Sequence, residues 1–213
     1  MKTVILAGGL GTRLGSLTRD IPKPMLLVDK YPILTHIMET YINYGNVDFI
    51  IALGYKGEII ERYFDKYKVF NRKYEIPLNK NNIFKNKFKS INKDKINIEL
   101  IPTGKKSLTA KRLKLLEKYL IDDENFMLTY GDGLSNVNLN KLINFHKKHK
   151  KMVTLTAVKP PARFGVLKIK DGNVLQFKEK SKKDLSWING GFFVIEPKFF
   201  KYLKNDSTYL ERK

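Results

Sequence analysis

The chain has 213 residues, of which 42% are hydrophobic and 12% aromatic, which is enough for a domain with a hydrophobic core and excludes a disordered chain. It contains no cysteine, which excludes disulfides and thiolate metal sites and indicates a reducing compartment, the cytoplasm. The formal net charge is +20, but the lysines alternate with apolar residues along helical segments and form no aromatic-basic stripe, a pattern that disfavours nucleic acid as the main partner.

Short apolar runs alternate with helical patterns along the chain, which is typical of an α/β fold with a mostly parallel sheet. No apolar run approaches the roughly 18 residues that cross a bilayer, so no membrane partner is expected. In chain order, the first part of the pattern predicts strand 3–7, helix 33–44, strand 48–53, helix 58–67, strand 96–101, helix 110–119, strand 125–129 and helix 139–149.

The remaining segments modify this parallel pattern. Residues 71–95 are rich in Lys and Asn and contain Pro77, so they are predicted to be an irregular insertion. After a strand at 153–158, the apolar runs 166–169 and 174–177 flank Asp171-Gly172, a strong hairpin signal. A strand at 191–195 and a short helix at 199–203 follow. We therefore expect one domain, 1–213, with a Rossmann-like, mostly parallel mixed sheet flanked by helices and an inserted antiparallel hairpin.

A glycine-rich segment follows the first predicted strand and reads Leu6-Ala7-Gly8-Gly9-Leu10-Gly11-Thr12-Arg13-Leu14. Glycines at the carboxyl end of a strand let the backbone turn tightly and point several N–H groups at phosphate oxygens. Ligands of open α/β sheets bind at these strand ends. Arg13 and Lys23, the latter held within Pro22-Lys23-Pro24, would bring two cations to the phosphates. The segment therefore predicts a phosphate site, although a simple turn with solvated cations is the alternative.

Two better-known phosphate loops do not match this segment. The dinucleotide-binding pattern needs a third glycine where Leu14 stands, and the P-loop needs a Gly-Lys-Ser/Thr ending that is absent. A second polar position is Asp132, which follows a predicted strand and is flanked by Gly131 and Gly133. From the residues alone, Asp132 fits either a metal ligand or an ordinary glycine-rich turn.

Taken together, these segments resemble the sugar-1-phosphate nucleotidyltransferases. The resemblance rests on the run 6–13 with Lys23-Pro24-Met25, and on the segments 54–57, 128–133, 163–165 and 187–193 in this order. Among subfamilies, the chain is most similar to the glucose-1-phosphate cytidylyltransferases. The resemblance implies that CTP and a sugar 1-phosphate form CDP-glucose and pyrophosphate with Mg²⁺, in the synthesis of cell-surface polysaccharide of the O-antigen type, and that the protein is a homo-oligomer.

The resemblance also implies roles for individual residues. Arg13, Lys23 and Asp132 would be catalytic, because the reaction depends on positioning and charge neutralisation, and Asp132 would hold the metal. The nucleotide would be bound by Leu6, Ala7, Gly8, Gly9, Gly11, Thr12, Arg13, Lys23, Gly54, Tyr55, Gly57 and Gly131. The sugar phosphate would be bound by Thr109, Arg112, Gly165, Glu179, Lys180, Asn189 and Gly190, although Glu179-Lys180 also fits a plain amphipathic strand end. His36, His146 and His149 lie on predicted helices and are read as ordinary helix residues.

The chain departs from the family pattern at two places. Ala110-Lys111 stand where the family usually has two glycines, which adds a Cβ and a charge near the expected ligand. The chain is expected to be shortened at its C-terminal end, because it ends at Lys213, before the segment that carries the family's second magnesium-binding aspartate. Alternatives are therefore a related nucleotidyltransferase for another nucleotide or phosphate acceptor, and a catalytically impaired nucleotide-binding homologue.

Overall fold

The computed structural model describes residues 1–9, 18–77, 95–160, 166–178, 186–203 and 210. Its contacts divide the chain into two compact units, one formed by 1–154 with 192–213 and the other by 155–191. The described elements are β1 (Thr3–Ala7), η2 (Lys23–Met25), β2 (Leu27–Val28), β3 (Tyr31–Pro32), α1 (Ile33–Ile42), β4 (Asp48–Leu53), α2 (Gly57–Phe64), η3 (Asp65–Tyr67), β5 (Lys68–Phe70), β6 (Lys73–Pro77), β7 (Lys95–Pro102), α3 (Thr109–Lys114), α4 (Glu117–Leu120), β8 (Phe126–Tyr130), α5 (Leu139–His149), β9 (Val153–Val158), β10 (Val166–Lys170), β11 (Asn173–Lys178), β12 (Ile188–Ile195) and η5 (Pro197–Tyr202).

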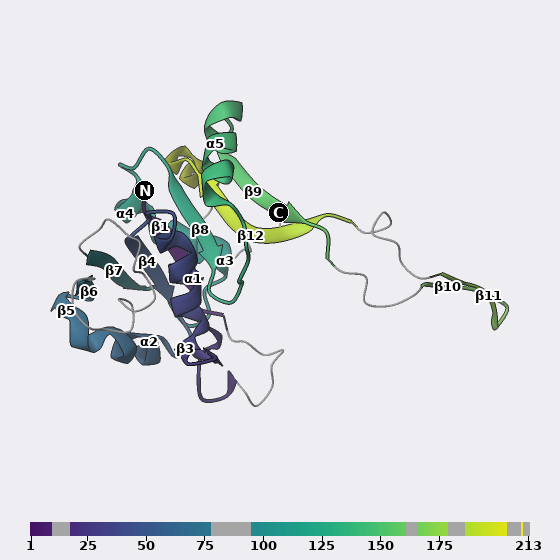
Figure 1. Ribbon diagram of the computed structural model, residues 1–213, viewed down its shortest axis with the longest axis horizontal. Coiled ribbons are helices and arrows are strands. Elements are labelled where there is room, and N and C mark those ends of the chain that lie inside the picture. The colour runs from purple at the N-terminus through teal and green to yellow at the C-terminus, as the bar shows by residue number, and fades with distance from the viewer. Residues whose placement is uncertain (10–17, 78–94, 161–165, 179–185, 204–209, 211–213) are drawn as a thin grey trace. The chain divides into compact units, whose positions relative to one another are not determined.

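A mixed sheet forms the centre of the larger unit (Figure 1). Its strand order is β5-β6-β7-β4-β1-β8-β12-β9, and the neighbours β7, β4, β1 and β8 run parallel to one another. The pairs β6–β7 and β12–β8 are antiparallel. The carboxyl ends of the four parallel strands therefore meet at one edge of the sheet, as the α/β interpretation of the sequence predicted.

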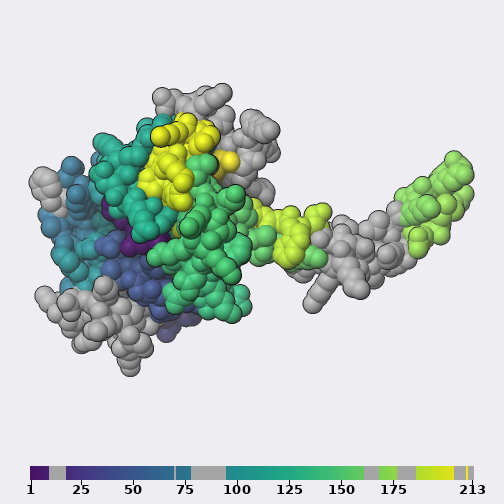
Figure 2. All heavy atoms as spheres, turned by 90° about the horizontal axis from the view of Figure 1, so that it is seen from above, coloured from purple at the N-terminus to yellow at the C-terminus, as the bar shows by residue number. Residues whose placement is uncertain are grey.

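Both faces of the sheet are covered, which explains why its central strands are apolar throughout. On one face, Ile5, Ile51 and Met127 pack with the apolar residues of α1, α2 and α5. On the other face, Val4, Ile50 and Leu128 pack with α3, α4 and η5. Figure 2 shows residues 109–120 beside 197–202 on that second face, and Lys114 Nζ donates to the carbonyl of Phe200 (3.1 Å). The alternation of side chains along each strand thus builds two cores.

The structure corrects two predictions about elements. Residues 73–77, within the expected irregular insertion 71–95, form strand β6, whose buried Tyr74 and Ile76 alternate with exposed residues against β7. The expected helix 110–119 is two helices, α3 and α4, because the amides of Leu116 and Tyr119 bond three residues back and tighten the turn between them.

The smaller unit contains the predicted hairpin. Strands β10 and β11 pair antiparallel around Asp171 and Gly172, both in the left-handed region with φ of 50° and 78°. That geometry is the tight two-residue turn that Asp-Gly favours. Among the described residues, none of the helices has the length and apolar composition of a bilayer span.

The histidines at the end of α5 belong to a buried network that the sequence interpretation missed. The Lys151 amide donates to His149 Nδ1 (2.9 Å), so the other nitrogen, Nε2, carries the proton and donates to Thr154 Oγ1 (2.6 Å). The Thr154 hydroxyl then donates to His146 Nδ1 (2.8 Å), and His146 Nε2 donates to Asn125 Oδ1 (3.0 Å). When both imidazoles are neutral, each donated proton in this series of hydrogen bonds therefore has one acceptor.

Candidate active site

The glycines that follow three neighbouring parallel strands lie together at the carboxyl edge of the sheet. Gly8 follows β1, Gly54 follows β4 and Gly131 follows β8. The Tyr55 amide donates to the carbonyl of Gly8 (3.4 Å), and the Gly131 amide donates to the carbonyl of Leu6 (2.9 Å). The structure thus brings together three of the segments that the sequence assigned to the nucleotide.

An ion pair stands at this edge. Lys23 Nζ lies 2.5 Å from Asp132 Oδ2, although 109 residues separate the two in the chain. Lys23 is the first residue of η2, and Asp132 lies in the turn after β8. Their side chains are 33% and 39% exposed, so both charges remain accessible to a ligand. The structure therefore places two of the three predicted catalytic residues in contact.

Gly131 explains how Lys23 reaches Asp132. A Cβ at position 131 would lie 2.9 Å from the Leu6 carbonyl oxygen and 2.9 Å from Pro24 Cγ, closer than side chains tolerate. The backbone of Gly131 is not in the left-handed region, so the requirement for glycine here comes from close packing. Pro24 and Met25 are buried, and this packing fixes the direction of η2.

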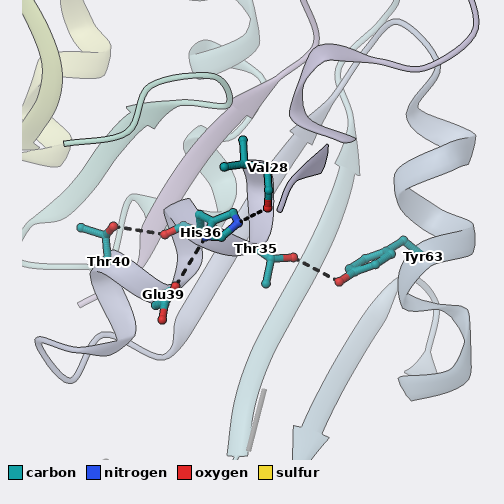
Figure 3. A network of polar contacts seen from close by, with 6 residues as sticks. All are labelled: Val28, Thr35, His36, Glu39, Thr40 and Tyr63. Atoms are coloured by element: carbon teal, nitrogen blue, oxygen red, sulfur yellow. Dashed lines mark hydrogen bonds and ion pairs between the residues drawn. The ribbon is translucent and has the colours of Figure 1, made fainter. Parts of the chain in front are cut away.

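Polar contacts of α1 anchor the segment that follows Lys23 (Figure 3). His36 Nε2 donates to the carbonyl of Val28 in the β2–β3 hairpin (2.9 Å), and His36 Nδ1 lies 3.7 Å from Glu39 Oε2. Thr35 Oγ1 and the Tyr63 hydroxyl share a hydrogen bond of 3.1 Å, which joins α1 to α2. These contacts hold the hairpin and both helices in one arrangement, so the C-terminal end of η2 is connected to a fixed hairpin.

The loop 54–57 contacts the residues that precede Lys23. The Tyr55 hydroxyl donates to the carbonyl of Arg19 (3.0 Å), and Lys56 Nζ lies 3.7 Å from Asp20 Oδ1. At Gly57, a Cβ would lie 3.0 Å from Leu53 Cβ. The loop 54–57, predicted to bind the nucleotide, is thus packed between β4 and the segment that leads to Lys23.

Arg112 is buried beneath this edge, with 3% of its surface exposed. Its Nη2 donates to the carbonyls of Gly8 (2.8 Å) and Lys105 (3.5 Å), and its Nη1 donates to the carbonyl of Leu53 (3.1 Å) and to Thr103 Oγ1 (2.6 Å). Burial lowers the pKa of the guanidinium. The guanidinium therefore contacts three strand ends at once.

Thr103 is a site residue that the sequence interpretation missed. Its hydroxyl donates to the Leu53 carbonyl (2.7 Å) and accepts from Arg112, and it is buried. The available signal was its position, because Thr103-Gly104 follows the parallel strand β7 as Gly54 follows β4. A rule that inspects the residues after every parallel strand would have included it.

The predicted sugar-phosphate residues that the structure describes belong to both units, with Thr109 and Arg112 in the larger one. Thr109 Oγ1 accepts from the Leu210 amide (2.7 Å) at the start of α3. Asn189 and Gly190 belong to the smaller unit, where Asn189 Oδ1 accepts from the Gly191 amide (2.8 Å) and a Cβ at Gly190 would lie 2.9 Å from the Thr156 carbonyl oxygen. The structure corrects the concern about Ala110, because its Cβ packs in the second core. The predicted residues outside the described part of the chain are Gly11, Thr12, Arg13, Gly165, Glu179 and Lys180.

Asp132 is the candidate metal ligand at this edge of the sheet. Its carboxylate is accessible, and a Cβ at Gly133 would meet no atom within 4 Å, so there is open space beside it. The Lys23 ammonium already binds the carboxylate as a cation. Within the described ranges, no group of three or more His, Cys, Asp or Glu side chains could hold a metal ion alone. The residues present thus fit a cation that takes its other ligands from phosphates and water, as Mg²⁺ does.

Comparisons with known proteins agree with this geometry. A family model described as nucleotidyl transferase matches residues 2–213. The glucose-1-phosphate cytidylyltransferase of Salmonella typhimurium is 44% identical over 215 residues, which cover 100% of this chain and 81% of that protein. The D-glycero-alpha-D-manno-heptose 1-phosphate guanylyltransferase of Aneurinibacillus thermoaerophilus is 33% identical and is covered to 77%, with 94% of this chain.

A solved structure adds the fold to these similarities. The crystal structure of HddC from Yersinia pseudotuberculosis, complexed with GMP-PN, has a TM-score of 0.67 and 26% identity, and the match covers 99% of this chain and 83% of that one. The strand order, the glycine-rich strand ends and the Lys23–Asp132 pair are thus found in a chain that matches one family model over nearly its whole length. The protein belongs to the nucleotidyl transferase family.

Proposed function

We propose that the protein transfers the cytidylyl group of CTP to glucose 1-phosphate, forming CDP-glucose and releasing pyrophosphate. The observation that carries this proposal is the accessible Lys23–Asp132 pair beside the glycine-rich ends of β1 and β8. An ammonium and a carboxylate at a glycine-lined strand edge suit a reaction between two phosphate groups. The choice of CTP and glucose 1-phosphate rests on the names of the relatives that are 44% identical.

In the proposed reaction, a phosphate oxygen of glucose 1-phosphate attacks the α-phosphorus of CTP. The bond from the α-phosphorus to the oxygen that bridges to the β-phosphate breaks, and pyrophosphate leaves with its electron pair. The chain's own contribution is positioning and charge neutralisation. Lys23 would lie between the α-phosphate and the sugar phosphate and neutralise their charge, and the backbone of Gly8, Gly54 and Gly131 would leave room for the nucleotide.

We also propose that Asp132 holds Mg²⁺ together with oxygens of the triphosphate. When bound, the metal would neutralise phosphate charge at the reacting group. Lys23, whose Nζ contacts Asp132 Oδ2, would stand beside the same phosphates and neutralise their charge. Arg13 stays a predicted ligand of the triphosphate. The homo-oligomer, the cytoplasmic location and the role in cell-surface polysaccharide synthesis also stay predictions.

The test is pyrophosphate release with glucose 1-phosphate and each of CTP, UTP, dTTP, GTP and ATP, in Mg²⁺ and in excess chelator. We expect turnover with CTP that disappears on chelation. A clear preference for another triphosphate would contradict the base assignment. CTP binding at equilibrium without turnover under saturating Mg²⁺ would instead favour a catalytically impaired homologue.

A further inference from the structure

Arg112 differs from the other cations of the candidate site by its burial. Lys23 is one-third exposed, whereas Arg112 is almost completely enclosed. Its Nη hydrogens point at chain oxygens of Gly8, Leu53 and Thr103. A ligand that took the place of these acceptors would leave buried carbonyls unpaired, which is costly. The geometry therefore does not suit a direct contact with a sugar phosphate.

The acceptors of Arg112 come from three separate segments of the nucleotide-binding edge. Gly8 ends β1, Leu53 ends β4, and Thr103 follows β7. A guanidinium presents a rigid planar fork of donors and can hold several acceptors in a fixed relation, whereas an ammonium is a single point. The Leu53 carbonyl receives both Arg112 Nη1 and the Thr103 hydroxyl, so the two side chains act on the same strand end.

The guanidinium of Arg112 packs directly against the backbone of two glycines of this edge. A Cβ at Gly8 would lie 2.2 Å from Arg112 Cζ, and a Cβ at Gly54 would lie 2.4 Å from Arg112 Nη1. Neither glycine has a backbone in the left-handed region. A Cβ at Gly54 would also lie 2.6 Å from the Cα of Gly8, so the need for glycine at position 54 comes from Gly8 as well as from Arg112. At Gly8, the need comes from the Arg112 guanidinium.

We propose that Arg112 is a positioning residue, which fastens the ends of β1, β4 and β7 beneath the nucleotide and acts on CTP through Gly8 and Gly54. The kinetic consequences of this inference rest on the proposed function. The structural part, that Arg112 holds the three strand ends together, does not depend on that function. Arg112 forms no ion pair within the described part of the chain. This absence is expected both for a positioning residue and for a residue that binds a phosphate directly. The experiments must therefore separate the two roles.

The kinetic test compares Arg112→Lys and Arg112→Met with Lys118→Met, which removes an exposed cation from the neighbouring helix α4. We expect the KM for CTP to rise at least tenfold in both Arg112 variants, more in Met than in Lys, while the KM for glucose 1-phosphate stays within about twofold. The control should match the wild type. A selective rise in the KM for glucose 1-phosphate, or an unchanged KM for CTP, would overturn the proposal.

A second test needs no turnover and so stands even if the proposed function fails. The urea midpoints of Gly8→Ala, Arg112→Ala and the double variant form a thermodynamic cycle. We expect Gly8→Ala to lower the midpoint in the wild type and to have little further effect when Arg112 is Ala, because the added methyl group then has space. Arg112→Lys takes the place of Arg112→Ala if the latter does not fold. If the midpoint shift of the double variant equals the sum of the two single shifts, the proposed contact between Arg112 and the Gly8 backbone would be refuted.

Discussion

Two polar clusters lie at opposite ends of β8. At its amino end, Asn125 precedes the strand and accepts from His146, and at its carboxyl end Gly131 and Asp132 follow it. In the first cluster, the two histidines, Thr154 and Asn125 form one directed series of hydrogen bonds. In the second, Lys23 and Asp132 are accessible and lie beside glycines, and Arg112 under the neighbouring strand ends is as buried as His146.

This difference teaches what separates a site from a structural network. Both ends bury polar groups and satisfy them, as buried polar groups require. Only the carboxyl end, among the described residues, combines glycines that leave room with an accessible ion pair. Buried polarity alone would have indicated both ends equally. Substitutions at the carboxyl end should therefore lower activity, and substitutions at the amino end should lower stability alone.

The largest effect is expected at the ion pair. Lys23→Met and Asp132→Asn should each lower kcat/KM about 10²- to 10³-fold. The first removes a positive charge that would neutralise the reacting phosphates, and the second removes the carboxylate that would hold the metal. Steady-state pyrophosphate release measures this, and urea unfolding provides the control. Since both side chains are partly exposed, the free energy of unfolding should change little. Full activity in either variant would show that the ion pair at the carboxyl end is not part of the active site.

A smaller effect is expected from the support of Lys23. Gly131→Ala should destabilise the protein by about 1–3 kcal/mol and lower activity, because the added Cβ pushes against Pro24 and the Leu6 carbonyl. Gly133→Ala is the matched control, since its Cβ would meet no atom within 4 Å. Urea unfolding and turnover of both variants decide the point. Equal effects of the two substitutions would contradict the packing argument.

The sequence predicted most of the strands and helices, but few of the contacts between them. The bounds of β4, α5 and β9 were predicted to the residue, because continuous apolar runs and helical spacing are local signals. Strand β6 was missed, because a short strand that ends in Pro77 between Lys- and Asn-rich stretches resembles a loop. Its alternation of Tyr74 and Ile76 with polar residues was the signal present.

The candidate site divides in the same way. Lys23 and Asp132 were identified from their motifs, but their contact joins residues 109 positions apart and depends on close packing at Gly131. Arg112 was assigned to the sugar phosphate from the family resemblance, and only the fold shows its contacts with three strand ends. The hydrogen bonds of His146 likewise come from three elements, and no local spacing encodes them.

At the amino end, stability should change without activity. Thr154→Val removes a buried hydroxyl that serves both histidines, and should cost about 1–2 kcal/mol by leaving imidazole nitrogens unpaired. The KM values should stay unchanged, because the cluster lies at the far end of β8 from Asp132. The control is Thr40→Val, whose hydroxyl bonds back to the His36 carbonyl within α1. Loss of turnover in Thr154→Val at full stability would abolish the distinction between the two ends.

The smallest effect is a pH dependence that belongs to the amino end. Burial lowers the pKa of His146 below 6.5, with His149 and Lys198 acting in the same direction and Glu196 opposing them. As the pH falls below about 6.5, the unfolded chain binds a proton at this histidine while the folded protein does not, so the free energy of unfolding decreases until the pH passes the lower folded pKa.

The directed hydrogen bonds give the same sign, because a protonated His146 has no acceptor nitrogen for the Thr154 hydroxyl. Urea unfolding at pH 7.5, 6.5 and 5.5 should therefore show a steeper loss of stability in the wild type than in His146→Gln, whose amide can keep one donor and one acceptor without titrating. The difference between the two profiles reports the loss of the titrating side chain at position 146. Parallel pH profiles would mean that His146 binds a proton equally well in the folded and the unfolded protein, which would contradict the lowered pKa.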